Sequence, residues 1–219
     1  MRKQPKRKDF PLQGPAGTLE ALLEAPQGDD LNGCAIVCHP HPLYGGTLQN
    51  KVVHMLARSF VGSGIASLRF NFRGVGKSAG VFDDGEGEVE DTLAAAAWMK
   101  NAFPGRPLWL AGFSFGAAIA VRAAHACKPA GLISVAPAVS RFMGKLDTQP
   151  ECPWLILQGD QDELVDIDET IAWFNRLEPG PELEVLAGAE HFFHGKLVLL
   201  RNTVEEFVQR NQRCAVKPK

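Results

Sequence analysis

The sequence has little net charge, no apolar run of membrane length and no paired cysteine motif. Its 219 residues include 23 lysines and arginines against 25 aspartates and glutamates, a formal net charge of −2 at pH 7. This balance creates no field that would gather nucleic acid or an anionic membrane, which favours small, roughly neutral partners. No stretch approaches the roughly 18 apolar residues that a bilayer-spanning helix needs, so we expect no membrane insertion.

The five cysteines exclude further classes of protein. Their number is odd, and the chain has no CxxC pair or paired Cys/His spacing, so the sequence predicts reduced thiols rather than a disulfide framework or a zinc site. We therefore expect a cytoplasmic protein. The basic residues within 2–8 precede Pro11 and Gly14 rather than an apolar segment. We interpret them as a frayed, solvated tail and not as a signal peptide.

Strand-like and helix-like segments alternate through the rest of the chain. Gly17–Ala25 is typical of an antiparallel strand at the start of a sheet. Six continuously apolar segments indicate strands covered on both faces: Ala35–Cys38, Ala66–Phe70, Leu108–Phe113, Leu132–Ala136, Trp154–Gln158 and Leu183–Leu186. Helices are expected at Asn50–Ser63, Glu86–Lys100, Ala117–Cys127, Asp168–Leu177 and Leu197–Arg210. The alternation predicts an α/β protein whose mostly parallel sheet has helices on both faces.

The strongest local signal is the pentapeptide Gly112-Phe113-Ser114-Phe115-Gly116, which stands between an apolar strand and a helix of small residues. A nucleophilic serine on a strained strand-to-helix turn needs this composition, because the two glycines let the helix approach the strand closely. A serine that only capped the helix would not need both glycines. The pattern therefore predicts that Ser114 is a nucleophile.

This arrangement resembles the α/β-hydrolase superfamily, and the resemblance extends from about Gly17 to about Arg210. It implies an α/β-hydrolase fold with a mostly parallel sheet of about seven to eight strands. Fewer than twenty residues separate the expected strands that end at Ala136 and begin at Trp154, too few for the cap domain that many relatives insert there. We therefore expect no large cap domain, and one hydrolase domain over residues 10–212 between a basic flexible tail (1–9) and a C-terminal tail (213–219).

The resemblance also implies an acid and a base, which follow the serine in the chain order of this fold. Asp162 stands three residues after Gly159, as the superfamily's acid does. Asp160 is the alternative, although an aspartate directly after such a glycine more often caps the turn with its own carboxylate. His191 lies after the final strand, where the superfamily has its base, and His194 fits that offset less well.

The segment from Cys38 to Thr47, with the sequence CHPHPLYGGT, closes the expected third strand. It resembles the His-Pro-His-Pro-x-x-Gly-Gly segment of a group of small bacterial α/β hydrolases and lies where this fold builds its oxyanion hole. One donor there is the backbone N–H after the nucleophile, here that of Phe115. The two prolines of the segment have no N–H, which leaves His41 and Leu43. Resemblance to relatives with a His-Gly-x-Pro loop selects His41.

We expect five further side chains to line the substrate pocket: His39, Leu43, Tyr44, Phe113 and His194.

Two other patterns suggest different sites. The pair His39 and His41 suggests a metal, but zinc needs three or four ligands and no acid or further histidine stands nearby in sequence. Gly76-Lys77-Ser78 resembles the end of a phosphate-binding loop, but position 71 is Asn where that motif needs Gly, and no helix can start at Lys77. The segment instead resembles the Arg-Gly-x-Gly-x-Ser turn of α/β hydrolases, in which Arg73 holds neighbouring loops. We expect neither a metal nor a cofactor.

Together these residues predict acyl transfer to water. Ser114 attacks a carbonyl, His191 carries the proton, and Asp162 fixes the imidazole tautomer. The expected partner is a small acyl substrate, a carboxylic ester, and not a nucleic acid. A thioesterase or amidase on the same residues, and a catalytically idle binding scaffold of the same fold, stay open as alternatives.

Overall fold

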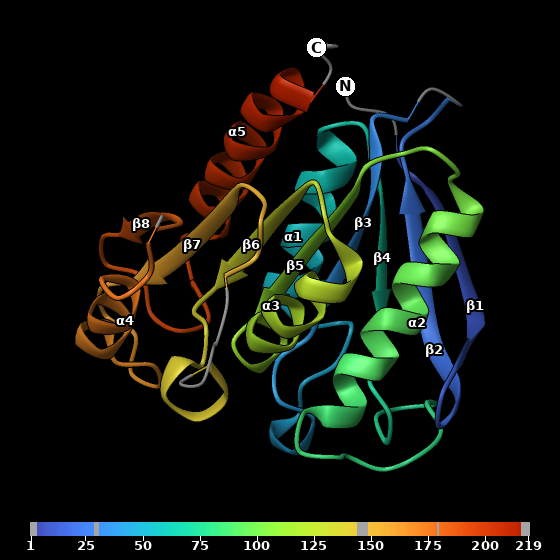
Figure 1. Cartoon of the computed structure of the whole chain (residues 1–219), viewed down its shortest axis with the longest axis horizontal. Coiled ribbons are helices and arrows are strands. Elements are labelled where there is room, and N and C mark those ends of the chain that lie inside the picture. The colour runs from blue at the N-terminus through green and yellow to red at the C-terminus, as the bar shows by residue number, and fades with distance from the viewer. Residues whose placement is uncertain (1–3, 29–30, 144–148, 179, 216–219) are drawn as a thin grey trace.

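An eight-stranded sheet forms the centre of the molecule in the computed structural model, which describes residues 4–28, 31–143, 149–178 and 180–215 (Figure 1). The strands are β1 (Lys6–Gly14), β2 (Gly17–Ala25), β3 (Gly33–Cys38), β4 (Ile65–Phe70), β5 (Leu108–Phe113), β6 (Gly131–Val135), β7 (Trp154–Gly159) and β8 (Glu182–Leu186). Their order is β1-β2-β4-β3-β5-β6-β7-β8. The strand β2 is antiparallel to β1 and β4, and the other neighbours are parallel. The predicted fold class is confirmed.

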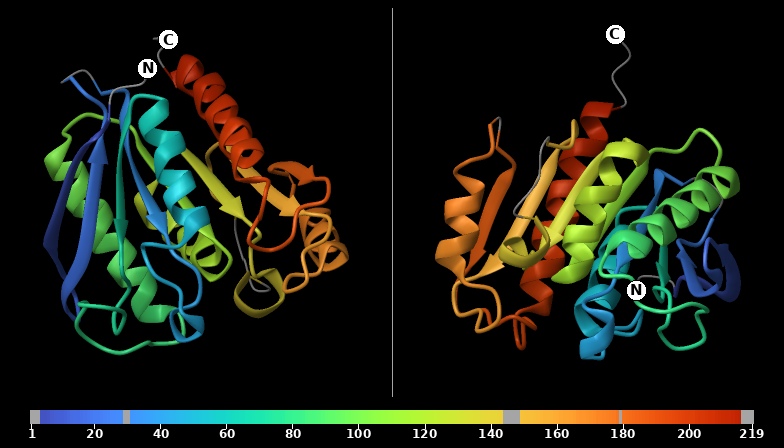
Figure 2. Two further views of the ribbon diagram at one scale, coloured as in Figure 1. Left: turned by 180° about the vertical axis from the view of Figure 1, so that it is seen from behind. Right: turned by 60° about the horizontal axis from the view of Figure 1, so that its bottom comes forward.

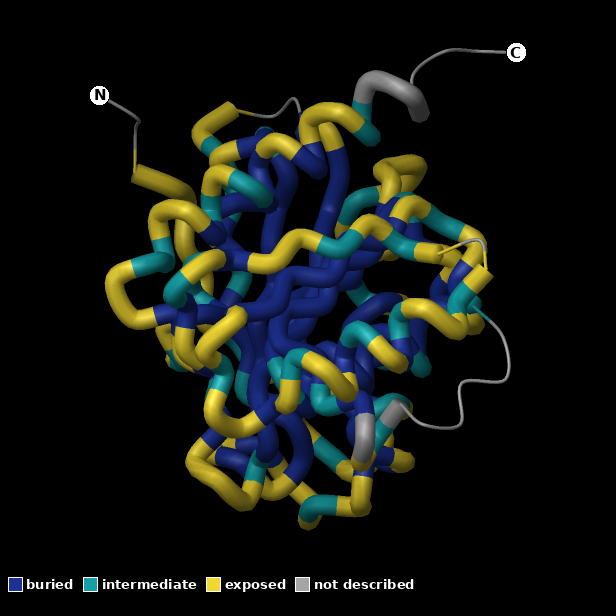
Figure 3. Tube along the Cα trace, turned by 90° about the vertical axis from the view of Figure 1, so that its left-hand side faces the viewer, coloured by how far each residue is buried: buried dark blue, intermediate teal, exposed yellow. Residues whose placement is uncertain are grey.

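Helices cover both faces of this sheet. One face carries α2 (Glu86–Ala102), α3 (Phe115–Cys127) and α4 (Ile167–Phe174), and the other carries α1 (Lys51–Gly62) and α5 (Leu197–Ala215) (Figure 2). Successive strand side chains point to opposite faces, so Ile36 packs in the core beneath α2 and α3 while Val37 packs in the core beneath α1. The central strands are therefore buried along their whole length (Figure 3), which explains their continuously apolar sequences.

The structure differs from the sequence prediction at both ends of the domain. Residues 6–9, interpreted as part of a flexible tail, belong to β1, where Lys6 lies opposite Ala25 and Gly14 opposite Gly17. An edge strand pairs on one side only, so β1 keeps exposed charged residues and lacks the apolar pattern of a central strand. At the other end, α5 continues to Ala215, past the predicted boundary at residue 212.

The carboxyl ends of the parallel strands meet at one edge of the sheet, at the bottom of Figure 1. The loops after β3 and β6 contain two short turns there, η1 (Pro42–Tyr44) and η2 (Val139–Met143). This is the edge at which α/β folds bind their ligands. No helix in the described ranges is long and apolar enough to cross a membrane.

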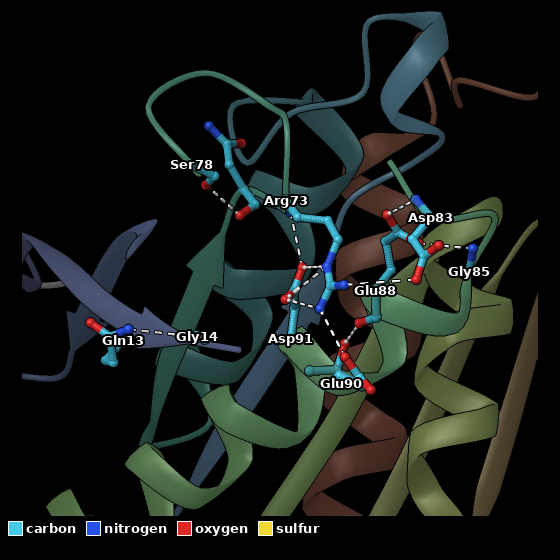
Figure 4. A network of polar contacts seen from close by, with 11 residues as sticks. Gln13, Gly14, Arg73, Ser78, Asp83, Gly85, Glu88, Glu90 and Asp91 are labelled. Atoms are coloured by element: carbon cyan, nitrogen blue, oxygen red, sulfur yellow. Dashed lines mark hydrogen bonds and ion pairs between the residues drawn. The ribbon is translucent and has the colours of Figure 1, made fainter. Parts of the chain in front are cut away.

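The loop after β4 is held by the buried side chain of Arg73 (Figure 4). Its Nη2 donates to Asp91 Oδ1 at 2.9 Å and to Glu90 Oε2 at 3.2 Å, and its backbone N–H donates to Asp91 Oδ2 at 2.9 Å. Asp91 is fully buried, so removing the guanidinium would leave an unpaired charge in the interior. Arg73 thus fastens this loop to α2.

The Gly-Lys-Ser sequence in the same loop is tied to β2 and begins no helix. Ser78 Oγ donates to the Asn71 carbonyl at 2.7 Å and accepts the Glu20 N–H at 2.9 Å. The backbone N–H of Lys77, which a phosphate-binding loop would offer to phosphate, donates to Glu20 Oε2 at 3.0 Å. The segment is therefore built as a structural turn.

Candidate active site

Ser114 occupies the sharp turn between β5 and α3, with φ 54° and ψ −117°. A non-glycine residue adopts such a conformation only when its surroundings impose it. A Cβ on Gly112 would lie 2.1 Å from the Gly116 carbonyl oxygen, and a Cβ on Gly116 would lie 2.4 Å from the carbonyl oxygens of Cys38 and His39. The two glycines are therefore required by the close approach of the helix to its own strand and to β3.

His191 and Asp162 form a buried pair. Nδ1 of His191 lies 2.8 Å from Oδ2 and 3.0 Å from Oδ1 of Asp162, and the two side chains are 3% and 0% exposed. Burial acts to raise the pKa of Asp162, but hydrogen bonds from His191 and from the N–H of Val165 outweigh it and hold that pKa below its usual value. The ionised carboxylate keeps the proton on Nδ1, which leaves Nε2 as the basic nitrogen.

The neighbouring acids have other partners. Asp160 Oδ1 accepts the Gly188 N–H at 2.6 Å and so closes the turn between two loops. Glu163 Oε2 accepts the backbone N–H of His191 at 3.2 Å, a contact that no local sequence pattern indicates. His194 is exposed and pairs with Glu190 at 3.2 Å. In the described part of the chain, the carboxylate on the imidazole of His191 is that of Asp162.

The two predicted oxyanion donors are backbone N–H groups that have no acceptor among the described residues. One belongs to Phe115, the first residue of α3, and the other to His41. The N–H of Leu43 is occupied, because it donates to Nδ1 of His41 at 3.2 Å. Gly116 lets the loop after β3 approach the start of α3 closely, and His41, Ser114 and Phe115 line the same cavity.

These groups open on one cavity of about 590 Å³ at the carboxyl edge of the sheet. Its described lining residues are Pro40, His41, Tyr44, Gly45, Gly46, Asn50, Ser114, Phe115, Ala138, Arg141, Phe142, Leu164, Val165, His191 and Phe192. A larger hollow of about 840 Å³ at the opposite edge, near Ser63 and Trp109, contains no serine–histidine pair. The chemistry therefore points to the smaller cavity.

Of the five side chains predicted to line the pocket, the structure places only Tyr44 in the cavity wall. Phe113 and His39 are fully buried beneath the cavity wall. Phe113 is the last residue of β5, and His39 is the first residue of the loop after β3, and both positions are covered on both faces of the sheet. Leu43 is 68% exposed and His194 points to solvent. Arg141 was missed because no local motif marks the segment after β6, and Phe192 was missed although it directly follows His191.

The buried ring of His39 connects the loop after β3 to the loop after β4 by hydrogen bonds, and we call this connection the His39 tie. Its Nδ1 lies 2.7 Å from the Pro40 carbonyl oxygen, and its Nε2 accepts the Phe72 N–H at 3.0 Å. A carbonyl only accepts and an N–H only donates, so the ring is neutral with its proton on Nδ1. Burial lowers the pKa of His39 to about 4. Among the described residues, no three His, Cys, Asp or Glu side chains are grouped to hold a metal.

We expect this tie to make stability depend on pH. Between pH 6.5 and about 4 the unfolded chain protonates His39 while the folded chain does not, so stability falls as pH decreases through this window. The full effect is about 3 kcal/mol, at 1.36 kcal/mol for each pKa unit. His39→Gln removes the titration and keeps an acceptor for Phe72. Urea unfolding at pH 7 and pH 4.5 should show a smaller loss for the variant than for the wild type, and equal losses would contradict this account.

The fold and this site define a serine hydrolase of the α/β class. Residues 45–144 match the family model described as serine aminopeptidase, S33. A lidless α/β serine hydrolase from Xanthomonas campestris is 43% identical, with 96% of each chain covered and a TM-score of 0.89. An α/β serine hydrolase homologue from Coxiella burnetii is 48% identical, with 91% of this chain and 96% of the other covered and a TM-score of 0.87.

A protein from Rickettsia prowazekii is 34% identical over 216 residues, covering 90% of this chain and 87% of its own. The identity with the two solved α/β serine hydrolases, over more than nine-tenths of this chain, shows that it belongs to the α/β serine hydrolases. The described residues form the predicted fold without a large cap, as in the lidless hydrolase from Xanthomonas campestris.

Proposed function

We propose that the protein hydrolyses a small carboxylic ester through an acyl-enzyme on Ser114. The observation that carries the proposal is the shared cavity, into which Ser114, His191 and the residues with the two unpaired N–H groups all open. A nucleophile, a base and a pair of oxyanion donors around one volume are the parts that acyl transfer needs.

The reaction proceeds in two steps. Ser114 Oγ attacks the carbonyl carbon as Nε2 of His191 takes its proton, and the N–H groups of Phe115 and His41 bind the oxyanion. The imidazolium returns the proton to the leaving alkoxide, which departs as an alcohol and leaves the acyl-enzyme. Water then attacks with the same base, and the carboxylic acid is released. The carboxylate of Asp162 stabilises the imidazolium throughout and does not itself take the proton.

The lining of the cavity favours an ester over the N-terminal peptide bond that the name of the matching family model suggests. An aminopeptidase must hold a protonated α-amino group, which calls for carboxylates in the site. The described lining contains no Asp or Glu and contains one arginine, Arg141. Cleavage of a thioester would require the same charges in the cavity lining as cleavage of an ester, so a thioesterase is the near alternative.

A fluorophosphonate probe tests the proposal directly, because it reacts with an activated serine. We expect the wild type to be labelled and Ser114→Ala to stay unlabelled. The wild type, before it is treated with the probe, should cleave 4-nitrophenyl esters of short acids and leave amino-acyl 4-nitroanilides intact, and labelling should abolish the cleavage. A wild type that resists the probe would support the idle scaffold, and preferred cleavage of the anilides would support a peptidase.

A further inference from the structure

One permanent charge stands among the described residues that line the cavity, and it is that of Arg141. The other described lining residues are apolar, glycine, or polar without a carboxylate. Arg141 is exposed, and no carboxylate pairs with it in the described part of the chain. An arginine that faces a cavity without a partner offers a rigid fork of donors to an incoming anion.

The turn η2 places Arg141 close to the reacting centre. This turn begins at Val139, shortly after β6 ends at Val135. The Ala138 N–H lies 3.5 Å from the Ser114 carbonyl oxygen, and the Phe142 N–H donates to the Ala138 carbonyl at 3.1 Å. The Phe142 ring packs edge-on against Phe115, with centroids 4.9 Å apart. The guanidinium carbon of Arg141 lies 5.3 Å from the centroid of the same Phe142 ring. The charge is therefore held at the cavity wall by packing that includes an oxyanion donor.

The field of Arg141 extends across this part of the cavity. Burial lowers the pKa of His41, the positive charge of Arg141 lowers it further, and the carboxylate of Asp84 acts in the opposite direction. Asp84 does not line the cavity, and neither does Glu163, whose carboxylate accepts the His191 N–H. The carboxylate of Asp162 lies behind the His191 ring and does not line the cavity either, so Arg141 carries the permanent charge on the described cavity wall.

We propose that Arg141 selects substrates that carry a carboxylate, so that the ester cleaved on Ser114 is anionic. A carboxylate has one negative charge and two oxygens that match the guanidinium fork. A phosphate monoester carries about 1.5 to 2 negative charges near neutral pH, more than one guanidinium neutralises. The inference rests on the proposed ester hydrolysis and adds the chemical class of the substrate.

Three chromogenic esters test the inference. The neutral reference is 4-nitrophenyl hexanoate. The mono-4-nitrophenyl ester of adipic acid has the same chain length with a carboxylate on the acyl part, and the hexanoate of 3-carboxy-4-nitrophenol has one on the leaving group. The readout is the ratio of kcat/KM for each anionic ester to that of the reference, which cancels general damage to catalysis.

In Arg141→Gln we expect this ratio to fall about tenfold for at least one anionic ester, the size expected for a hydrogen bond between charged groups. The ester that responds identifies the side on which the carboxylate binds. Arg141→Lys should recover part of the ratio, because it keeps the charge without the fork. Arg58→Gln removes an equal charge from the exposed side of α1, away from the cavity, and should leave the ratio at its wild-type value.

Two results would overturn the inference, and they differ. If the wild type cleaves the reference and Arg141→Gln keeps both wild-type ratios, the role of Arg141 is wrong and ester hydrolysis stands. If the wild type cleaves none of the three esters, the proposed function fails and the inference fails with it.

Discussion

Ser114→Ala should reduce kcat for a chromogenic ester by about 10⁴-fold or more, because the atom that forms the acyl-enzyme is removed. His191→Ala should lose a similar factor, since no other described imidazole pairs with Asp162. The double variant should be little worse than either single one, because the two groups act as a unit. Steady-state kinetics at saturating substrate measure the loss. If Ser114→Ala kept activity within tenfold of the wild type, Ser114 would not be the nucleophile.

Matched substitutions of Asp162 and Asp160 test which aspartate is the acid that pairs with His191. Asp162→Asn should lose about 10²- to 10⁴-fold in kcat, because an amide cannot hold the imidazole in the tautomer that leaves Nε2 basic. Asp160→Asn should keep kcat within a few-fold, since an amide oxygen still accepts the Gly188 N–H. Urea unfolding separates lost stability from lost catalysis in both variants. The reverse ranking of the two kcat values would make Asp160 the acid.

His41→Pro should reduce kcat by about 10²- to 10³-fold, the usual cost of losing one oxyanion donor. Proline fits this position, because His41 has φ −52° and its N–H donates to no described residue. The substitution therefore removes the N–H without breaking a hydrogen bond of that group. It also removes the ring, which packs against Tyr44, Phe82 and Phe115.

His41→Ala provides the control for the ring. It removes the same packing and the acceptor of the Leu43 N–H but keeps the backbone donor, so we expect a loss of only a few-fold in kcat. Leu43→Pro should also be milder than His41→Pro, because the N–H of Leu43 points to the His41 ring. Circular dichroism must show all three variants folded. If His41→Ala is as damaging as Ser114→Ala, the imidazole itself takes part in the chemistry.

The local patterns predicted the central strands and helices well. Strands β3 to β7 are buried on both faces of the sheet, as their sequences predicted. Strand β8 was predicted to be covered in the same way, but it lies at the other edge of the sheet and is largely exposed. The glycines around Ser114 mark a turn that no larger residues permit. Strand β1 was missed, because an edge strand that is paired on one side needs no apolar run.

The sequence by itself determined the fold class and the choice of Ser114, Asp162 and His191 as candidates, since those signals lie in short stretches whose geometry follows from composition. The tertiary structure alone decided what surrounds them. His39 and His41 stand two residues apart in one motif, yet one ring is sealed beneath the cavity as a neutral tie and the other borders it. Arg141 faces the cavity because η2 is folded against Ser114 and Phe115. Burial and charge at a site depend on elements that are distant in the chain, and no local pattern records which of them will pack together.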